Sequence, residues 1–419
     1  MKLGLLGSDP QTLAVAAAAV AAGDAIGPAV GIAADLPENS GEIDRQPVEQ
    51  WQLLLEAERC DAVLVAIEGW NDERAEQVRT LVQAGRPLLL NHPACLSMLW
   101  AYELDMILAD SAASIVPFLP ARRHPLIIQL RQFIEQSIAG GGPFGSLETL
   151  QFERRQADRS RDAVLASLAR DADLIRVLVG EPARLMALGS GGDAAWATLA
   201  IGFSGPDQLP VRWQVAKGAV EEMTAELICA TGRLRIDVPG DLNGCWQLSQ
   251  LPDAAGQPLP LDHPTDSENF DPAAVMLETL RRQLIGTADS GVDETIAAAT
   301  WADAARTIEL AETVPRSLTK GRAIDLHQEE FSELGTFRGT MASLGCGIIM
   351  AGLLLLFLAT LVGGVAQAAG WEFGERLASM WPYVILVTLL LFLSLQLLPL
   401  LLPTQASPPS DTAHTPPPG

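Results

Sequence analysis

Short apolar runs alternate with amphipathic or alanine-rich segments over the first 115 residues of the chain. The predicted strands are 3–6, 29–33, 61–66 and a run that ends at Asn91, and the predicted helices are 11–22, 48–58 and a segment that ends at Gly85. This alternation predicts a parallel sheet with helices on both faces. The run that ends in Asn91-His92-Pro93 places two polar side chains at the carboxyl edge of the sheet, where α/β proteins bind ligands.

The pattern changes near Ser146, after which runs of strand character follow one another. The runs read LETLQFERR, ARLMALGS, AAWATLAIGFS, LPVRWQVAKG, EMTAELICAT and GRLRIDVPG. They predict an open, mostly antiparallel sheet, closed by helices at about 271–285 and 292–312. The predicted fold class is therefore α/β, with a parallel-sheet domain followed by an α+β domain.

Two long apolar runs near the C-terminus predict a pair of transmembrane helices. Arg338 is followed by 33 uncharged residues before Glu372, and a second run, VILVTLLLFLSLQLLPLLLP, follows Tyr383. Each run reaches the roughly 20 residues that cross a hydrocarbon core. Trp371, Trp381 and Tyr383 flank the short connection and are typical interfacial anchors.

The basic residues predict the orientation of this hairpin. Lys320, Arg322 and Arg338 precede the first span, the connection carries Arg376 alone, and the tail has no lysine or arginine. The positive-inside rule therefore predicts that the soluble part and both termini are cytoplasmic. The expected domains are 1–118 and 119–330, a linker at 331–343, the hairpin at 344–403 and a disordered tail at 404–419.

Charge and cysteine usage narrow the function. The net charge is −23, so the surface repels phosphate backbones and nucleic-acid binding is not expected. The five cysteines are odd in number and lack CxxC spacing, which favours reduced thiols in a cytosolic compartment over disulfides or a zinc site.

The first strand-to-helix turn, GLLGSDPQT, admits two interpretations. A dinucleotide site requires GxGxxG, and here Gly7 is followed by Asp9 and Thr12 at the second and third glycine positions. The alternative is that Ser8 or Asp9 caps the helix with Pro10 in its first turn, which the complete capping chemistry favours.

Several segments together resemble the Gfo/Idh/MocA oxidoreductase family. They are DAVLVAI and AGRPLLLNHPA, LPARRHPLIIQLRQFIEQSIAGGGPFGSLETLQFERR, DADLIRVLVGEPARLMAL and SLTKGRAIDL, in the family's order over about residues 1–330. The resemblance implies a Rossmann domain, a second α/β domain, and an oxidoreductase that uses NAD or NADP as cofactor and a sugar or polyol as substrate. It also implies a homo-oligomer that pairs through the second sheet if the exposed positions of that sheet are apolar.

The resemblance assigns candidate site residues, although the motifs are altered. The family's Glu-Lys-Pro strand end corresponds to Asn91, His92 and Pro93, and its histidine and aspartate correspond to Arg170 and Asp173. The candidate catalytic residues are His92, Arg170 and Asp173, and the candidate cofactor-binding residues are Gly7, Ser8, Asp9, Asp35 and Asn91. Asp35 stands where a ribose-binding acid would, or simply begins a loop. No metal ligands are expected.

Two functions remain open at this stage. His92 is a candidate general base, with His124 approaching the same cleft, or it is a strand-end residue that hydrogen-bonds locally. Arg122 and Arg123 could neutralise acidic neighbours, and with Arg170 the cleft is expected to be cationic and able to hold an anion. One hypothesis is a membrane-anchored NAD(P)-dependent oxidoreductase acting on a sugar-like substrate. The other is an inactive relative that binds a metabolite or protein at the membrane, and the altered motifs favour it.

Overall fold

The computed structural model describes most of the first 326 residues and a few positions beyond them. The described residues are 1–32, 45–192, 194–204, 209–251, 259–260, 267, 269–285, 296–326, 354, 357–358, 360–361, 364–365 and 368–370. The chain divides into two units, Met1–His327 and Gln328–Gly419.

The first unit begins with a six-stranded parallel sheet. Its order is β3-β2-β1-β4-β5-β6, formed by β1 (Lys2–Leu6), β2 (Ala25–Val30), β3 (Arg45–Gln46), β4 (Ala62–Val65), β5 (Leu88–Asn91) and β6 (Ile115–Phe118). The order reverses between β1 and β4, so a crevice is expected at the carboxyl ends of these strands. This arrangement confirms the predicted parallel sheet.

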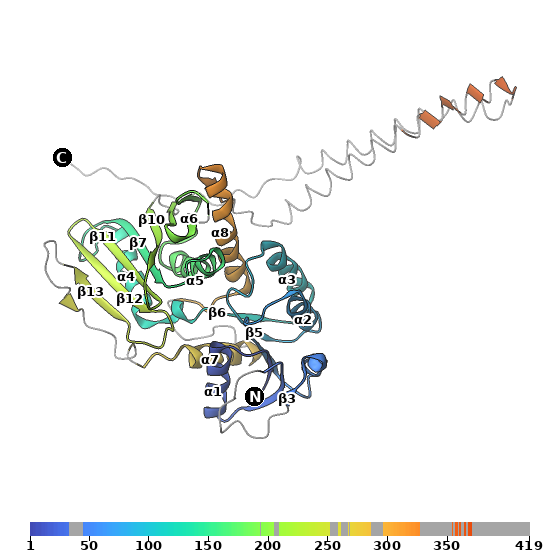
Figure 1. Cartoon of the computed structure of the whole chain (residues 1–419), viewed down its shortest axis with the longest axis horizontal. Helices are drawn as coiled ribbons and strands as arrows, with labels where there is room; N and C mark the ends of the chain where they lie inside the picture. Colours follow the sequence, from blue (N-terminus) through green and yellow to red (C-terminus); the bar gives the residue numbers. More distant parts are fainter. Residues whose placement is uncertain are drawn as a thin grey trace, which may run out of the picture. The chain divides into compact units, whose positions relative to one another are not determined.

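Helices cover both faces of this sheet. They are α1 (Pro10–Ala21), η1 (Val48–Leu55), α2 (Asp72–Gln83), α3 (Met98–Asp110), α7 (Pro272–Ile285) and α8 (Trp301–Lys320). Leu3 and Leu5 of β1 pack in the core beneath α1 and α7, whereas Leu6 packs in the core beneath α2, α3 and α8. Figure 1 shows α7 beside α1 and α8 beside α3. The first sheet is therefore closed partly by helices that follow the second sheet in the chain.

The second sheet has nine strands in the order β14-β13-β12-β11-β7-β10-β9-β8-β15. The strands are β7 (Leu147–Gln156), β8 (Arg184–Leu188), β9 (Ala200–Ser204), β10 (Pro210–Lys217), β11 (Glu222–Cys229), β12 (Gly232–Pro239), β13 (Gln247–Leu251), β14 (Leu259–Pro260) and β15 (Ile324–Asp325). All neighbours are antiparallel except β7 and β10. The prediction of an open, mostly antiparallel sheet is thus confirmed.

One face of the second sheet is buried and the other is polar. Phe152 and Trp213 point into the core beneath α4 (Pro125–Ile138) and α5 (Arg161–Val179). On the other face, Arg155 pairs with Glu153 at 2.8 Å and with Glu222 at 2.9 Å. Two copies of the chain were expected to pair through this sheet if its exposed side chains were apolar. This part of the face is charged, so that condition is not met there, and the homo-oligomer stays a prediction.

Several element boundaries differ from the predictions. Strand β2 begins at Ala25, segment 48–58 contains the 3₁₀ helix η1, and α8 begins at Trp301. The start of α8 has a clear cause: the Thr300 hydroxyl accepts from the Asp303 amide while the Asp303 carboxylate accepts from the Thr300 amide. This capping box fixes the first turn. The run AAWATLAIGFS was predicted as a strand, but it begins with the short helix α6 (Ala194–Ala197), and β9 starts at Ala200. A short 3₁₀ helix, η2 (Pro120–Arg123), precedes α4.

The predicted hairpin falls mainly on residues that the structure does not describe. Among the described positions, no helix combines the length and apolar character required to cross a bilayer. Most of 344–403 and all of 331–343 and 404–419 lie outside these positions. The hairpin, linker and tail therefore stay predictions.

Candidate functional site

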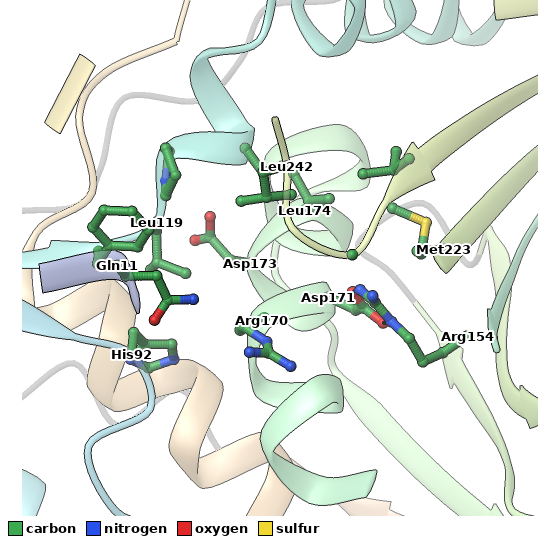
Figure 2. A pocket seen from close by; sticks show the side chains of 15 residues that line it. Gln11, His92, Leu119, Arg154, Arg170, Asp171, Asp173, Leu174, Met223 and Leu242 are labelled. Carbon is green, nitrogen blue, oxygen red and sulfur yellow. Dashed lines mark hydrogen bonds and ion pairs between the residues drawn. The ribbon is translucent and has the colours of Figure 1, made fainter. Parts of the chain in front are cut away.

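A cavity lies where the carboxyl edge of the first sheet meets the second sheet and α5. It encloses about 560 Å³, part of which is its open mouth. Its lining is Gln11, His92, Phe118, Leu119, Pro120, Ala121, Arg154, Arg170, Asp171, Asp173, Leu174, Met223, Val238, Gly240 and Leu242. Figure 2 shows these side chains converging from both parts of the unit. All three candidate catalytic residues therefore line one cavity.

The carboxylate of Asp9 occupies the N-terminus of α1. The side chain is the helix cap, because Oδ1 accepts from the Thr12 amide at 2.8 Å. Oδ2 accepts from the Ile67 amide at 2.8 Å. The Asn91 side-chain nitrogen donates to both oxygens, at 2.6 and 2.7 Å. The carboxylate is 5% exposed and is satisfied from three directions, which confirms the capping interpretation.

Arg74 closes the other side of the same turn. Its Nη1 donates to the carbonyls of Leu6 at 3.0 Å and Ala66 at 3.2 Å. Gly7 has a φ of +78°, and a Cβ there would lie 2.3 Å from this nitrogen. Burial lowers the pKa of Arg74. Arg74 was not among the residues predicted from the sequence. The feature that could have pointed to it is its position as a basic residue in the first turn of α2.

These residues do not fit a dinucleotide diphosphate at the N-terminus of α1. The diphosphate of such a cofactor binds to free amides at this helix end. Here the Thr12 amide is taken by Asp9, whose buried charge would repel a second anion. The buried Asn91 Oδ1 has no hydrogen-bond partner among the described residues, and an acceptor cannot bind phosphate oxygens. Gly7 and Ser8 lie in the turn, and Asp35 lies outside the described residues.

His92 is buried at the end of β5 and is neutral. Its Nε2 lies 2.8 Å from the Thr307 hydroxyl, which donates its own hydrogen to the Ala304 carbonyl. In this arrangement the Nε2 of His92 donates to the Thr307 hydroxyl, and Nδ1 is an acceptor. Burial and then the charge of Arg170 lower the pKa of His92 to about 3. Such an imidazole is a weak proton acceptor for an alcohol.

Asp173 is held by an arginine from the junction between the sheets. Both of its oxygens accept from Arg122, with Nε at 3.0 Å from Oδ2. Arg122 also lies 3.4 Å from the Asp303 carboxylate. Burial alone would lower the pKa of Arg122, but the Asp173 carboxylate outweighs it and raises this pKa. The expectation that Arg122 neutralises acidic neighbours is confirmed, and Asp173 is engaged in a buried ion pair.

Arg170 belongs to a second charged group, whose other members Arg154, Asp171 and Glu221 were missed by sequence reasoning. Arg154 makes a two-point contact with Asp171, and Nε1 of Trp213 donates to the same carboxylate at 2.9 Å. Nη2 of Arg170 lies 3.0 Å from Oε1 of Glu221, and Nη1 of Arg154 lies 3.6 Å from it. Burial and then the Arg154 guanidinium lower the pKa of Arg170.

The charge expected for the cleft needs correction. The charged residues that line the cavity are two arginines, Arg154 and Arg170, and two aspartates, Asp171 and Asp173. Each cation is matched by one anion, so this group is neutral rather than cationic.

His124 does not reach the cavity, which corrects a second expectation. It is 0% exposed and stacks on Trp246 with ring centroids 3.8 Å apart. Its Nδ1 accepts from the Leu126 amide at 3.1 Å and caps α4. His124 is therefore part of the packing at the start of α4.

Comparisons with known proteins place the fold. No family model matches the sequence, and no curated protein matches it. Among solved structures, myo-inositol dehydrogenase from Corynebacterium glutamicum shares 15% identity and a TM-score of 0.54 over 78% of this chain and 99% of that one. Aldose-aldose oxidoreductase from Caulobacter crescentus, complexed with glycerol, shares 14% identity and a TM-score of 0.59 with the same coverage of both chains.

A third similar structure contains a cofactor. Levoglucosan dehydrogenase, in a complex with NADH and L-sorbose, shares 14% identity and a TM-score of 0.58 over 78% of this chain and 99% of that one. The described fold is thus shared with solved sugar dehydrogenases, one of them in a complex with NADH. At these sequence identities, the similarity supports a shared fold alone.

Proposed function

We propose that this protein binds a small sugar-like ligand in the cavity, that it has lost NAD(P)-dependent hydride transfer, and that its C-terminal hairpin holds it at a membrane. The observation that carries the proposal is the Asp9 carboxylate at the N-terminus of α1, where it accepts from the Thr12 and Ile67 amides and from Asn91. The sugar-like ligand is proposed from the fold shared with sugar dehydrogenases.

The energetics favour a closed cofactor site. Hydrogen bonds to a charged group contribute about 1.5–3 kcal/mol each. A diphosphate at the α1 N-terminus would have to remove several such bonds to Asp9, or add its own charge beside a buried carboxylate. His92 adds support, because a neutral imidazole that donates to Thr307 is a poor replacement for a general base.

The membrane part of the proposal is supported by the sequence. The two uncharged or nearly uncharged runs after Arg338 and Tyr383 are long enough to span a bilayer. The basic residues before the first run favour a cytoplasmic soluble part. In this arrangement the cavity would sample metabolites of the cytoplasm.

The test is a calorimetric titration of the purified full-length protein with NADH and NADPH. We expect no saturable binding at millimolar cofactor, and binding to become measurable in Asp9→Gly, which removes the competing carboxylate. Ser97→Gly is the matched control, because Ser97 caps α3 through the Trp100 amide away from this turn. Saturable binding of either cofactor to the unaltered protein would overturn the proposal.

A second candidate is an NAD(P)-dependent oxidoreductase, favoured by the shared fold and by His92 lining the same cavity as Gln11 of α1. It requires the Asp9–Asn91 contact to open when the cofactor binds. Reduction of NAD or NADP by a panel of sugars and polyols, abolished in His92→Ala, would support this candidate over the first.

A further inference from the structure

Two arginines share one carboxylate oxygen beside the cavity. Arg170 and Arg154 both line the cavity, and both point a guanidinium nitrogen at Oε1 of Glu221, at 3.0 and 3.6 Å. Figure 2 shows the two guanidinium groups extending toward one another. Glu221 lies in the connection between β10 and β11, and its side chain is 42% exposed. A carboxylate that reaches in from the surface thus occupies a site formed by two cations.

We propose that Glu221 holds the place of a ligand carboxylate, and that the cavity binds a sugar acid whose carboxylate displaces the Glu221 side chain and bridges Arg170 and Arg154. The inference rests on the proposed function only in assigning ligand binding to this cavity.

The Glu221 side chain can rotate away from Arg170 and Arg154 without any movement of its backbone. The Gly240 amide donates to the Glu221 carbonyl at 2.9 Å, and a Cβ on Gly240 would lie 2.5 Å from that oxygen. The backbone is therefore held at close range, whereas the half-exposed carboxylate can rotate into solvent. Asp171 differs, because it is 1% exposed and bound by Arg154 and Trp213. Glu221 is thus the exchangeable anion of the pair.

Arg170 is correspondingly the exchangeable cation. Apart from Glu221, Arg170 has the Ser167 hydroxyl, at 3.3 Å, as its hydrogen-bond partner within the described part of the chain. Its side chain is 35% exposed, whereas that of Arg154 is 7% exposed. A guanidinium with one weak neutral partner and one half-exposed anion is well suited to bind a carboxylate at two points.

The charge balance selects the class of ligand. Arg154 and Arg170 are balanced by Asp171 and Glu221, so replacing Glu221 by one ligand carboxylate keeps this group neutral. A neutral sugar offers no charge to compete with Glu221. A phosphate ester carries about −1.5 to −2 charges at neutral pH and would leave an excess of negative charge. A monoanionic carboxylate is therefore favoured.

The remaining lining suits a polyhydroxylated ring. Gln11 and the Nδ1 acceptor of His92 offer hydrogen bonds, while Leu119, Leu174 and Met223 offer apolar contact. Sites for small ligands combine mostly apolar walls with a few placed polar groups.

The experiment titrates the full-length protein with D-glucuronate, D-glucose and D-glucose 6-phosphate by calorimetry. We expect D-glucuronate to bind most tightly. Glu221→Gln should bind it about tenfold more tightly, because a competing charge is gone, and Arg170→Gln about tenfold less tightly. Arg184→Gln is the matched control, since Arg184 forms an exposed ion pair with Asp325 and does not line the cavity.

The outcomes separate this inference from the proposed function. A gain in Glu221→Gln cannot come from misfolding, so unchanged or weaker affinity there would overturn the inference. Equal affinity for D-glucose and D-glucuronate, or failure of D-glucuronate to bind, would overturn it as well. Binding of D-glucose as tight as that of D-glucuronate would overturn this inference and leave the proposed sugar binding standing, whereas the NADH titration tests the proposed loss of hydride transfer.

Discussion

At the scale of single residues, the polar groups around the turn between β1 and α1 form hydrogen bonds with one another. The capping role of Asp9 could be predicted, because caps depend on neighbours such as Pro10. The contact with Asn91 could not, because the two residues are 82 positions apart and meet only when β1 and β5 lie in one sheet. The same holds for Arg170 and Glu221, 51 positions apart. Local chemistry was therefore predictable, and long-range pairing was not.

His92 should make the stability of the protein depend on pH. Its pKa falls from 6.5 to about 3 on folding. The unfolded chain therefore binds a proton at a higher pH than the folded chain, and folding loses stability as the pH falls from 6.5 toward 3. The loss is at most about 1.4 kcal/mol per pH unit. We expect the melting temperature of His92→Gln to fall less steeply over this interval than that of the unaltered protein.

The control for this measurement is Thr307→Val. This change removes the acceptor of the His92 Nε2 proton and should lower the melting temperature at every pH, while the buried imidazole keeps its pH dependence. An identical slope in His92→Gln and the unaltered protein would show that this imidazole does not control acid stability.

At the scale of elements, periodicity predicted which segments form helices and strands better than it predicted where they begin. Segment 292–312 was predicted as a helix, but α8 spans Trp301–Lys320 because its capping box lies at Thr300. The parallel pairing of β7 and β10 within an otherwise antiparallel sheet had no signal in the alternation. Alternation determines which face a residue occupies, whereas the choice of neighbouring strand depends on the connections and on α5.

The capping box of α8 gives a prediction at this scale. Thr300→Ala should lower the free energy of unfolding by about 1 kcal/mol, since it removes one cap. Asp303→Asn should cost more, because Asp303 also accepts from Arg176 at 3.0 Å and lies 3.4 Å from Arg122. Chemical denaturation of the full-length protein measures both, and a smaller effect for Asp303→Asn would contradict the role of these ion pairs.

At the scale of the whole molecule, α8 joins the two sheets into one unit. Trp301 and Ile308 pack in a core of the first sheet, whereas Leu310 and Val314 pack in the core of the second. Thr307 lies between these positions and holds His92 at the cavity. The sequence predicted both sheets and this helix, but not that one helix would serve both cores. The cavity owes its position to this shared helix as much as to the strand ends.

The proposed hairpin gives the last prediction, which concerns its orientation in a membrane. A reporter fused after Gly419 should be found on the cytoplasmic side. Lys320, Arg322 and Arg338 favour a cytoplasmic N-terminal end for the first span, and the second span brings the chain back to the same side. A reporter inserted in the connection, after Gly374, should read as external and serves as the control. Two cytoplasmic readings would show that neither run crosses the bilayer. An external reading after Gly419 with a cytoplasmic connection would reverse the orientation and place the cavity outside the cytoplasm.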